Sequence, residues 1–111
     1  MKWSIEYFNS DVENKILGLP DGLLARYIRL TDLMLEFGPN LGLPHTKLIK
    51  SDLFELRVKS KEGIARVFYC TLVGNKIFML HSFIKKSQKI PQKELKIAFS
   101  RLKEVKRHET R

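Results

Sequence analysis

Residues 53–91 read LFELRVKSKEGIARVFYCTLVGNKIFMLHSFIKKSQKIP, and this stretch decides the fold. It contains short apolar runs that are rich in aromatic and β-branched residues, as strands are. These runs are 53–59, 64–72 and 76–84. Ser60–Gly63 separates the first two runs, and Gly74-Asn75 separates the last two, as tight turns would. The pattern predicts three consecutive antiparallel strands joined by a four-residue turn and a two-residue turn.

The four-residue turn fixes which residues of the first two strands face each other. It pairs Lys59 with Ile64, Arg57 with Arg66, and Glu55 with Phe68. Like charges directly opposite each other destabilise a sheet, so Arg57 opposite Arg66 predicts a site for an anion. Arginine is also the side chain suited to planar, two-point phosphate recognition. The alternative is that both are surface arginines, one of them paired with Glu55.

Alternation along the strands then sorts the side chains onto two faces. The apolar face, where we expect the core, holds Phe54, Leu56, Val58, Ala65, Val67 and Tyr69. A two-residue turn at Gly74-Asn75 places Phe83 opposite Arg66 and His81 opposite Phe68. The second face is therefore predicted to hold Glu55, Arg57, Lys59, Arg66, His81, Phe83 and Lys85.

The remaining sequence predicts one more strand and three helices. Residues 2–8 alternate as a strand does. Ser10 with Glu13 has the form of a capping box, which predicts a short helix ending at Gly18. A second helix begins at Pro20 and stops at Gly38-Pro39, and residues 40–49 are predicted to be a loop. A last helix follows Pro91. The chain is thus predicted to be one α+β domain, 1–111, with the order β-α-α-β-β-β-α.

The charge of the chain favours a polyanionic partner. The net charge is +9 from 21 Lys+Arg and 12 Asp+Glu, and the sequence pI is near 9.9. Most of this excess lies in the last third of the chain. Such a balance in a small domain favours nucleic acid or the ribosome, with a solvated basic surface as the alternative.

Several other chemistries find no support in the sequence. The single Cys70 cannot form an internal disulfide, and no Cys/His cluster has zinc spacing. No phosphate-binding glycine loop, nucleophile elbow or compact acidic cluster for a catalytic metal is present. No signal peptide or membrane-spanning run is visible. We expect a cytoplasmic protein that uses no metal or cofactor.

Two residues near the arginines have a functional and a structural interpretation. His81 titrates near neutrality, which suits proton transfer, but a lone histidine between Met79 and Phe83 more often packs in a core. Phe83 is an ordinary core residue, or it is exposed beside the arginines and stacks an RNA base.

At this point the chain resembles a known family of toxins. The element order resembles the RelE/ParE toxin superfamily, and the motifs resemble its HigB-type, phage-derived branch. The motifs are Glu55-Leu56-Arg57, then Arg66-Val67-Phe68-Tyr69, then residues 80–91, which read LHSFIKKSQKIP. The last motif, followed by a basic helix, is the most specific of the three. The resemblance covers nearly the whole chain.

The resemblance implies a small RelE-like fold and the toxin of a bacterial type II toxin–antitoxin pair. Such toxins are endoribonucleases that cleave mRNA on the ribosome by attack of a 2′-OH on the adjacent phosphate. Arg57 and Arg66 would then hold the phosphate. Lys85, with Lys86 as the alternative, would transfer a proton, and Glu55 would be a base or would orient Arg57. His81 remains a further catalytic candidate. The expected RNA contacts are Lys59, Phe83, Lys89, Lys93 and Lys96.

The resemblance also implies partners and leaves other functions open. The expected partners are the ribosome, its mRNA and a cognate helix-turn-helix antitoxin of the HigA-like kind. One alternative is a ParE-like toxin that binds DNA gyrase without nuclease chemistry. Another is a non-catalytic RNA-binding module. The lysine pair that follows Phe83, next to paired arginines, favours the ribonuclease.

Overall fold

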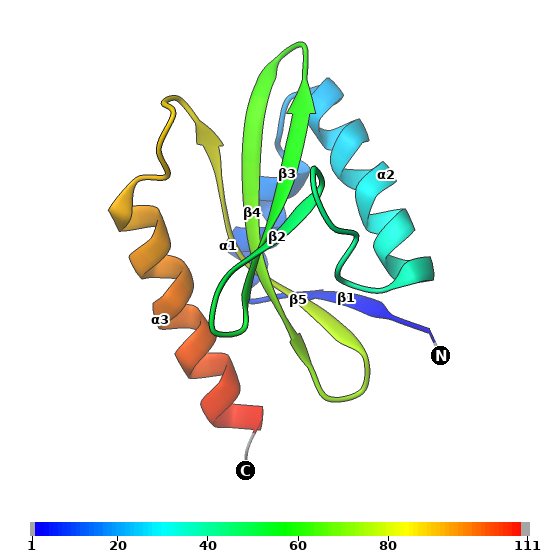
Figure 1. The fold of residues 1–111 in the computed structure, drawn as a ribbon, viewed down its shortest axis with the longest axis vertical. Coiled ribbons are helices and arrows are strands. Elements are labelled where there is room, and N and C mark those ends of the chain that lie inside the picture. Colours follow the sequence, from blue (N-terminus) through cyan, green and yellow to red (C-terminus); the bar gives the residue numbers. More distant parts are fainter. Residues whose placement is uncertain (1, 110–111) are drawn as a thin grey trace.

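The computed structural model describes residues 2–109 and shows three helices against a five-stranded mixed sheet (Figure 1). The elements are β1 (Ser4–Tyr7), α1 (Ser10–Leu17), α2 (Asp21–Phe37), β2 (Thr46–Lys50), β3 (Leu53–Ser60), β4 (Gly63–Leu72), β5 (Lys76–Lys85) and α3 (Gln92–Glu109). The strands lie in the order β1-β5-β4-β3-β2. Within residues 2–109 the β1–β5 pair is parallel, and the β5–β4, β4–β3 and β3–β2 pairs are antiparallel. The predicted α+β class is confirmed.

The predicted register of β3 and β4 is confirmed. Arg57 lies opposite Arg66, Lys59 opposite Ile64, and Glu55 opposite Phe68. The turn between the strands also reaches the second helix. Glu62 Oε1 accepts hydrogen bonds from the backbone N–H groups of Gly22 (2.5 Å) and Leu23 (3.2 Å). These are orphan donors at the start of α2, which lacks a side-chain cap of its own.

Near the arginines, β4 and β5 pair in the predicted register, but the turn that joins the two strands differs from the prediction. Leu72 pairs with Lys76, so the turn has three residues, 73–75, and not two. Nearer the arginines the register shifts by one residue, with Leu80 as the extra residue of β5. The longer turn and this bulge offset each other. Phe83 therefore still faces Arg66, and His81 still faces Phe68.

The prediction of a loop over residues 40–49 is wrong in its second half. Strand β2 pairs antiparallel with β3 along its outer edge, with Thr46 opposite Leu56 and Lys47 opposite Glu55. The backbone N–H of Arg57 also donates to the carbonyl of His45, at 2.8 Å. Gly42 and Pro44 favoured the prediction of a loop. The strand forms nevertheless, because the edge of β3 has backbone N–H and C=O groups that need partners.

The helices begin and end close to where the sequence places them. Gly18 and Gly38 follow the last residues of α1 and α2, as predicted. The predicted capping box does not form: Asn9, and not Ser10, is the N-cap of α1 and accepts from the N–H of Val12, whose apolar side chain cannot return the bond. Asn9 suits this position for the same reason as Ser10, because its short side chain carries an oxygen that accepts from a backbone N–H of the first helical turn.

The two faces of the sheet carry two separate apolar clusters. The first lies between the sheet and α1 and α2, and includes Leu56, Val58, Ala65, Val67, Tyr69, Ile77 and Met79 from the strands. The second lies under α3, and includes Leu53, Phe68, Cys70, Leu80 and Phe83 together with Ala98, Leu102 and Val105. In Figure 1, α2 and α3 flank the central strands on opposite sides. Within residues 2–109 no helix is long and apolar enough to cross a membrane.

Candidate nucleic-acid interface

Two arginines and a glutamate form a charged cluster on the face of the sheet that carries α3. We call Glu55, Arg57 and Arg66 the arginine cluster. One carboxylate oxygen of Glu55 lies 3.0 Å from Nε of Arg57, and the other lies 3.2 Å from Nε of Arg66. The side chain of Glu55 is 1% exposed, against 30% for Arg57 and 9% for Arg66. A buried carboxylate thus separates the two like charges that the register brings together.

The buried arginine of this cluster has unused donors. Among residues 2–109, Nε and Nη1 of Arg66 and Oε2 of Glu55 are buried and have no hydrogen-bond partner of good geometry. Most buried polar groups in proteins have one. Burial lowers the pKa of Arg66, while the adjacent Glu55 raises it and Arg57 lowers it further. The cluster combines two cations with one anion, and so it keeps one positive charge for an incoming anion.

A row of lysines lies next to the cluster along the strands. Ile64 of β4 has Lys59 on one side and Lys85 on the other. Residues two apart on a strand share a face and lie about 7 Å from each other. Lys59 and Lys85 therefore extend the positive face beyond Arg57 and Arg66, as predicted. Lys59 is exposed and Lys85 is partly buried.

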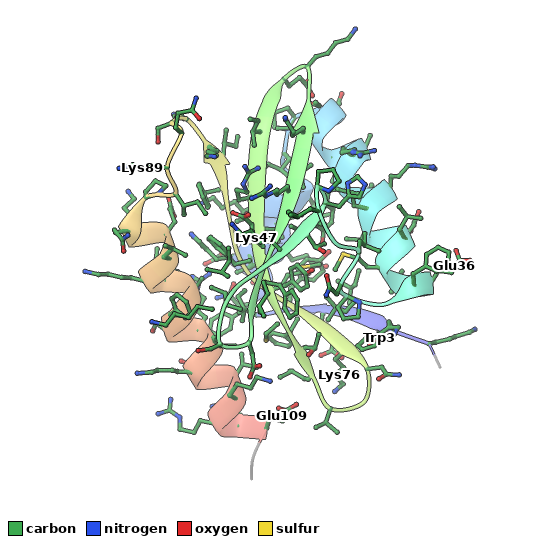
Figure 2. The ribbon with its side chains drawn as sticks, viewed as in Figure 1. Trp3, Glu36, Lys47, Lys76, Lys89 and Glu109 are labelled. Carbon is green, nitrogen blue, oxygen red and sulfur yellow. The ribbon has the colours of Figure 1, made fainter. Side chains whose placement is uncertain are left out.

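Strand β2 contributes a cation that the sequence interpretation missed. Lys47 is exposed and lies opposite Glu55 in the β2–β3 register, so its side chain shares the face of the arginine cluster. Figure 2 labels Lys47 near the centre of the view, over the strands. Residues 46–50 read TKLIK, in which polar and apolar residues do not alternate, so no periodic signal in the sequence indicated this strand.

Phe83 is a core residue, which corrects the expectation that it stacks an RNA base. It is 6% exposed, and its ring stacks on Phe68 with centroids 5.8 Å apart. The helix α3 packs over this cluster. A base could reach the ring only if that packing opened.

His81 is also buried, and it has a specific partner. Its Nε2 lies 2.6 Å from Oε1 of Glu94 in the first turn of α3, and the residue is 6% exposed. Burial lowers the pKa of His81, whereas Glu94 opposes that shift. The structural interpretation of His81 therefore fits the geometry better than direct contact with a substrate. No pattern in the sequence indicated Glu94, which is 13 residues away from His81.

The lysines outside the sheet that the sequence singles out are all on the surface: Lys86, the alternative proton-transfer residue, and the predicted RNA contacts Lys89, Lys93 and Lys96. Lys86 and Lys89 lie in the exposed loop that connects β5 to α3, and Figure 2 shows Lys89 there. Lys93 and Lys96 are exposed on the first turns of α3. The buried stripe of α3 comprises Ala98, Leu102 and Val105, so these lysines project away from it. They form a basic margin beside the sheet.

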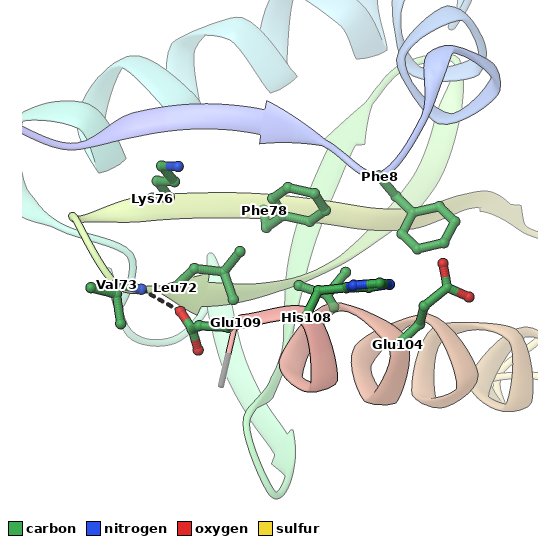
Figure 3. Close-up of a pocket in the computed structure, with 9 residues that line it drawn as sticks. Phe8, Leu72, Val73, Lys76, Phe78, Glu104, His108 and Glu109 are labelled. Atoms are coloured by element: carbon green, nitrogen blue, oxygen red, sulfur yellow. Dashed lines mark hydrogen bonds between the residues drawn. The ribbon is translucent and has the colours of Figure 1, made fainter. Parts of the chain in front are cut away.

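A cleft at the other end of the sheet has a different chemistry. It has a volume of about 470 Å³ and lies between the turn 73–75 and the C-terminal half of α3 (Figure 3). Its lining includes Phe8, Leu72 and Phe78, and Figure 3 shows the carboxylate of Glu109 bonded to the backbone N–H of Val73. Lined mainly by apolar side chains, it lacks the paired cations of the arginine cluster.

Metal binding finds no support in the described part of the chain. Across residues 2–109, no three His, Cys, Asp or Glu side chains are grouped closely enough to hold a metal ion. Cys70 is buried beneath α3, and burial raises the pKa of its thiol to about 11. A thiol with so high a pKa is a poor nucleophile at neutral pH.

Comparison with known proteins identifies one family. The model of the family described as phage derived protein Gp49-like (DUF891) matches residues 14–103, which is most of the chain. The match includes the arginine cluster, Lys85 and Glu94. A search of curated proteins finds no match.

Proposed function

The chain belongs to the phage-derived Gp49-like family, and from this membership and the arginine cluster we propose that it is a toxin of a bacterial type II toxin–antitoxin pair. Its activity would be that of a HigB-type endoribonuclease of the RelE superfamily, cutting mRNA on the ribosome. The α+β fold with a mixed five-stranded sheet is consistent with that superfamily. The family assignment supports the class of protein, and the geometry supports the chemistry.

The observation that carries this proposal is the burial of Arg66 and the hydrogen-bonding of its guanidinium group. Arg66 is nearly buried, lies directly opposite Arg57, has its Nε 3.2 Å from Oε2 of Glu55, and has a buried Nη1 with no hydrogen-bond partner in the described chain. A phosphate diester could accept from both arginines, with Glu55 behind them. Glu55 has both carboxylate oxygens beside arginine Nε atoms. We therefore assign it the orienting role and not that of a base.

In the proposed reaction the 2′-OH oxygen of a ribose forms a bond to the adjacent phosphorus. The bond from that phosphorus to the 5′ oxygen of the next nucleotide breaks. The 2′-OH loses its proton and the leaving 5′ oxygen gains one, so the products are a 2′,3′-cyclic phosphate and a 5′-OH end. Arg57 and Arg66 stabilise the negative charge that grows on the phosphate oxygens.

The lysines divide into two groups in this mechanism. Lys85 lies two residue pairs along the sheet from Arg66 and so shares its face, and we assign proton transfer to it, with Lys86 as the alternative. Lys59, Lys89, Lys93 and Lys96 would bind phosphates of mRNA or ribosomal RNA. Lys47 joins this group because it shares the face of the cluster. An antitoxin of the helix-turn-helix class would block ribosome entry.

The test is to map new mRNA 5′ ends in bacteria after brief induction of the chain. The variants are Arg66→Ala, Arg66→Lys and, as a matched control, Arg29→Ala, which removes an exposed arginine of α2. We expect 5′-OH ends in phase with the ribosomal A site for the wild type and for Arg29→Ala. Both Arg66 variants should lose at least about 100-fold of this cleavage, the usual cost of one transition-state donor.

Other outcomes would point elsewhere. Growth arrest with DNA-damage signalling and no new 5′ ends would favour a gyrase-binding toxin. If Arg66→Ala weakened ribosome binding only in proportion to the lost charge and cleavage were absent throughout, the chain would be an RNA-binding module. Cleavage that survived Arg66→Ala would contradict the role given to Arg66.

A further inference from the structure

The contact between His81 and Glu94 joins the last part of β5 to the start of α3. Nε2 of His81 and Oε1 of Glu94 are 2.6 Å apart, and both side chains are largely buried. The backbone N–H of Glu94 also donates to the carbonyl of Pro91, at 3.1 Å. The carboxylate thus lies in the first turn of a helix, where the helix dipole favours an acid.

This contact fixes the protonation pattern of the histidine. A carboxylate can only accept, so Nε2 of His81 must carry the proton. Burial lowers the pKa of His81, and Arg101 and Lys15 act in the same direction, whereas Glu94 opposes them. At neutral pH the ring is then the neutral Nε2–H tautomer. Hydrogen bonds from one ring nitrogen to a carboxylate fix the tautomer and orientation of catalytic and metal-binding histidines in the same way.

The segment closed by this contact carries the residues of the proposed chemistry. Between His81 and Glu94 lie Phe83, Lys85, Lys86 and Lys89. Phe83 stacks on His81 with centroids 6.3 Å apart. Among the described residues, the side chains of the loop 86–91 make one hydrogen bond, from Ser87 Oγ to the carbonyl of Lys89 at 3.0 Å, and that bond is internal to the loop. The position of the loop therefore depends on its two ends and on the packing of Ile90.

We propose that Glu94 is a positioning residue that holds His81 as the Nε2–H tautomer and clamps the first turn of α3 to β5. Lys85 is held by its pairing with Ile64 in the sheet, and the clamp fixes the loop that follows it and carries Lys86 and Lys89. Glu94 does not touch the RNA in this arrangement and acts through His81 and the loop. The consequence for cleavage rests on the proposed function, whereas the clamp itself belongs to the fold and can be tested without RNA.

The experiment compares Glu94→Ala and Glu94→Gln with Glu104→Ala, which removes an exposed glutamate from the same helix. Long-range ¹⁵N–¹H NMR of the purified chain reports the tautomer of His81. We expect a protonated Nε2 and an unprotonated Nδ1 in the wild type and in Glu94→Gln, since the amide oxygen still accepts. Hydrogen exchange of the amides of residues 95–98, in the first turns of α3, should speed up at least about tenfold in Glu94→Ala, as expected for loss of one charge-assisted hydrogen bond. It should not change in Glu104→Ala.

Cleavage of mRNA on purified ribosomes is the second readout. Glu94→Ala should lower kcat by about 10- to 100-fold, the cost of displacing reacting groups by about 1 Å. Glu94→Gln should recover most of that loss. If Glu94→Ala loses only thermal stability while kcat is unchanged at a permissive temperature, the role is structural and the proposal fails.

The two proposals can fail separately. A protonated Nδ1 on His81, or unchanged exchange of residues 95–98 in Glu94→Ala, would overturn the clamp whatever the chain does to RNA. If the wild type cleaves no mRNA while the tautomer and exchange results are as expected, the clamp stands and the proposed function falls.

Discussion

The two faces of the same sheet differ in what alternation along the strands gives them. Glu55 and Leu56 are consecutive residues of β3, both essentially inaccessible to solvent. Leu56 enters the apolar cluster under α1 and α2, whereas Glu55 lies between two arginines on the other face. One face is a continuous core. The other face is apolar and buried where α3 covers it, and it carries the charged side chains of the arginine cluster beside α3. The comparison teaches that one face supplies stability and that the other gives up some stability to hold charge.

The largest loss of stability should follow from a substitution on the apolar face of the sheet. Leu56→Ala removes a fully buried side chain and should lower the free energy of unfolding by about 2–5 kcal/mol. Urea denaturation measures this. The matched control is Leu48→Ala, which alters a half-exposed leucine on β2 and should stay within about 0.5 kcal/mol. Equal losses in the two variants would break the contrast between the faces.

Glu55→Gln probes the charged face at the neighbouring position. It replaces charge-assisted contacts to Arg57 and Arg66 with neutral ones, which should cost about 1.5–3 kcal/mol of unfolding free energy. Any RNA cleavage should fall about tenfold as the arginines lose their orientation. Glu6→Gln is the control, because Glu6 pairs with Lys76 at 3.7 Å on the exposed surface. That pair contributes at most about 1 kcal/mol. A larger loss at Glu6 would contradict the ranking.

The buried histidine under α3 should make stability depend on pH. Burial lowers the folded-state pKa of His81 below its ordinary value of 6.5. Below about pH 6.5 the unfolded chain then binds more protons at this site than the folded chain, so the free energy of unfolding falls with falling pH. The fall ends below the folded-state pKa. Urea titrations at several pH values measure this dependence. In the same pH window, the free energy of unfolding of His81→Gln should change less with pH than that of the wild type. Parallel curves would show that His81 keeps its ordinary pKa.

The smallest effect on folding should come from the basic margin. Lys96→Gln changes an exposed side chain of α3 and should leave stability within about 0.5 kcal/mol. If Lys96 binds a phosphate, the slope of log affinity for ribosomes against log salt should fall in magnitude by about 0.7–0.9. Arg29→Gln, on α2, should leave the slope unchanged. Identical slopes for both variants would remove Lys96 from the interface.

Much of this arrangement could be predicted because its signals are local. The alternation over residues 53–72 and the four-residue turn give the pairing of Arg57 with Arg66, which is observed. The predicted partner of Arg66 on β5 is also observed, although the turn was assigned one residue too few. That agreement came from a bulge at Leu80 that no sequence pattern indicates. Strand β2 was missed because an edge strand forms where a neighbour offers unpaired backbone groups.

The sequence by itself determined the strand faces, the helix limits at Gly18 and Gly38, and the meeting of two arginines. These follow from side-chain periodicity and backbone preferences within a few residues. Only the tertiary structure decided how α3 lies on the sheet. That placement buries Phe83 and brings Glu94 to His81. The sheet likewise sets Glu55 between the arginines. Contacts of this kind depend on packing between elements, and packing leaves no period in the sequence.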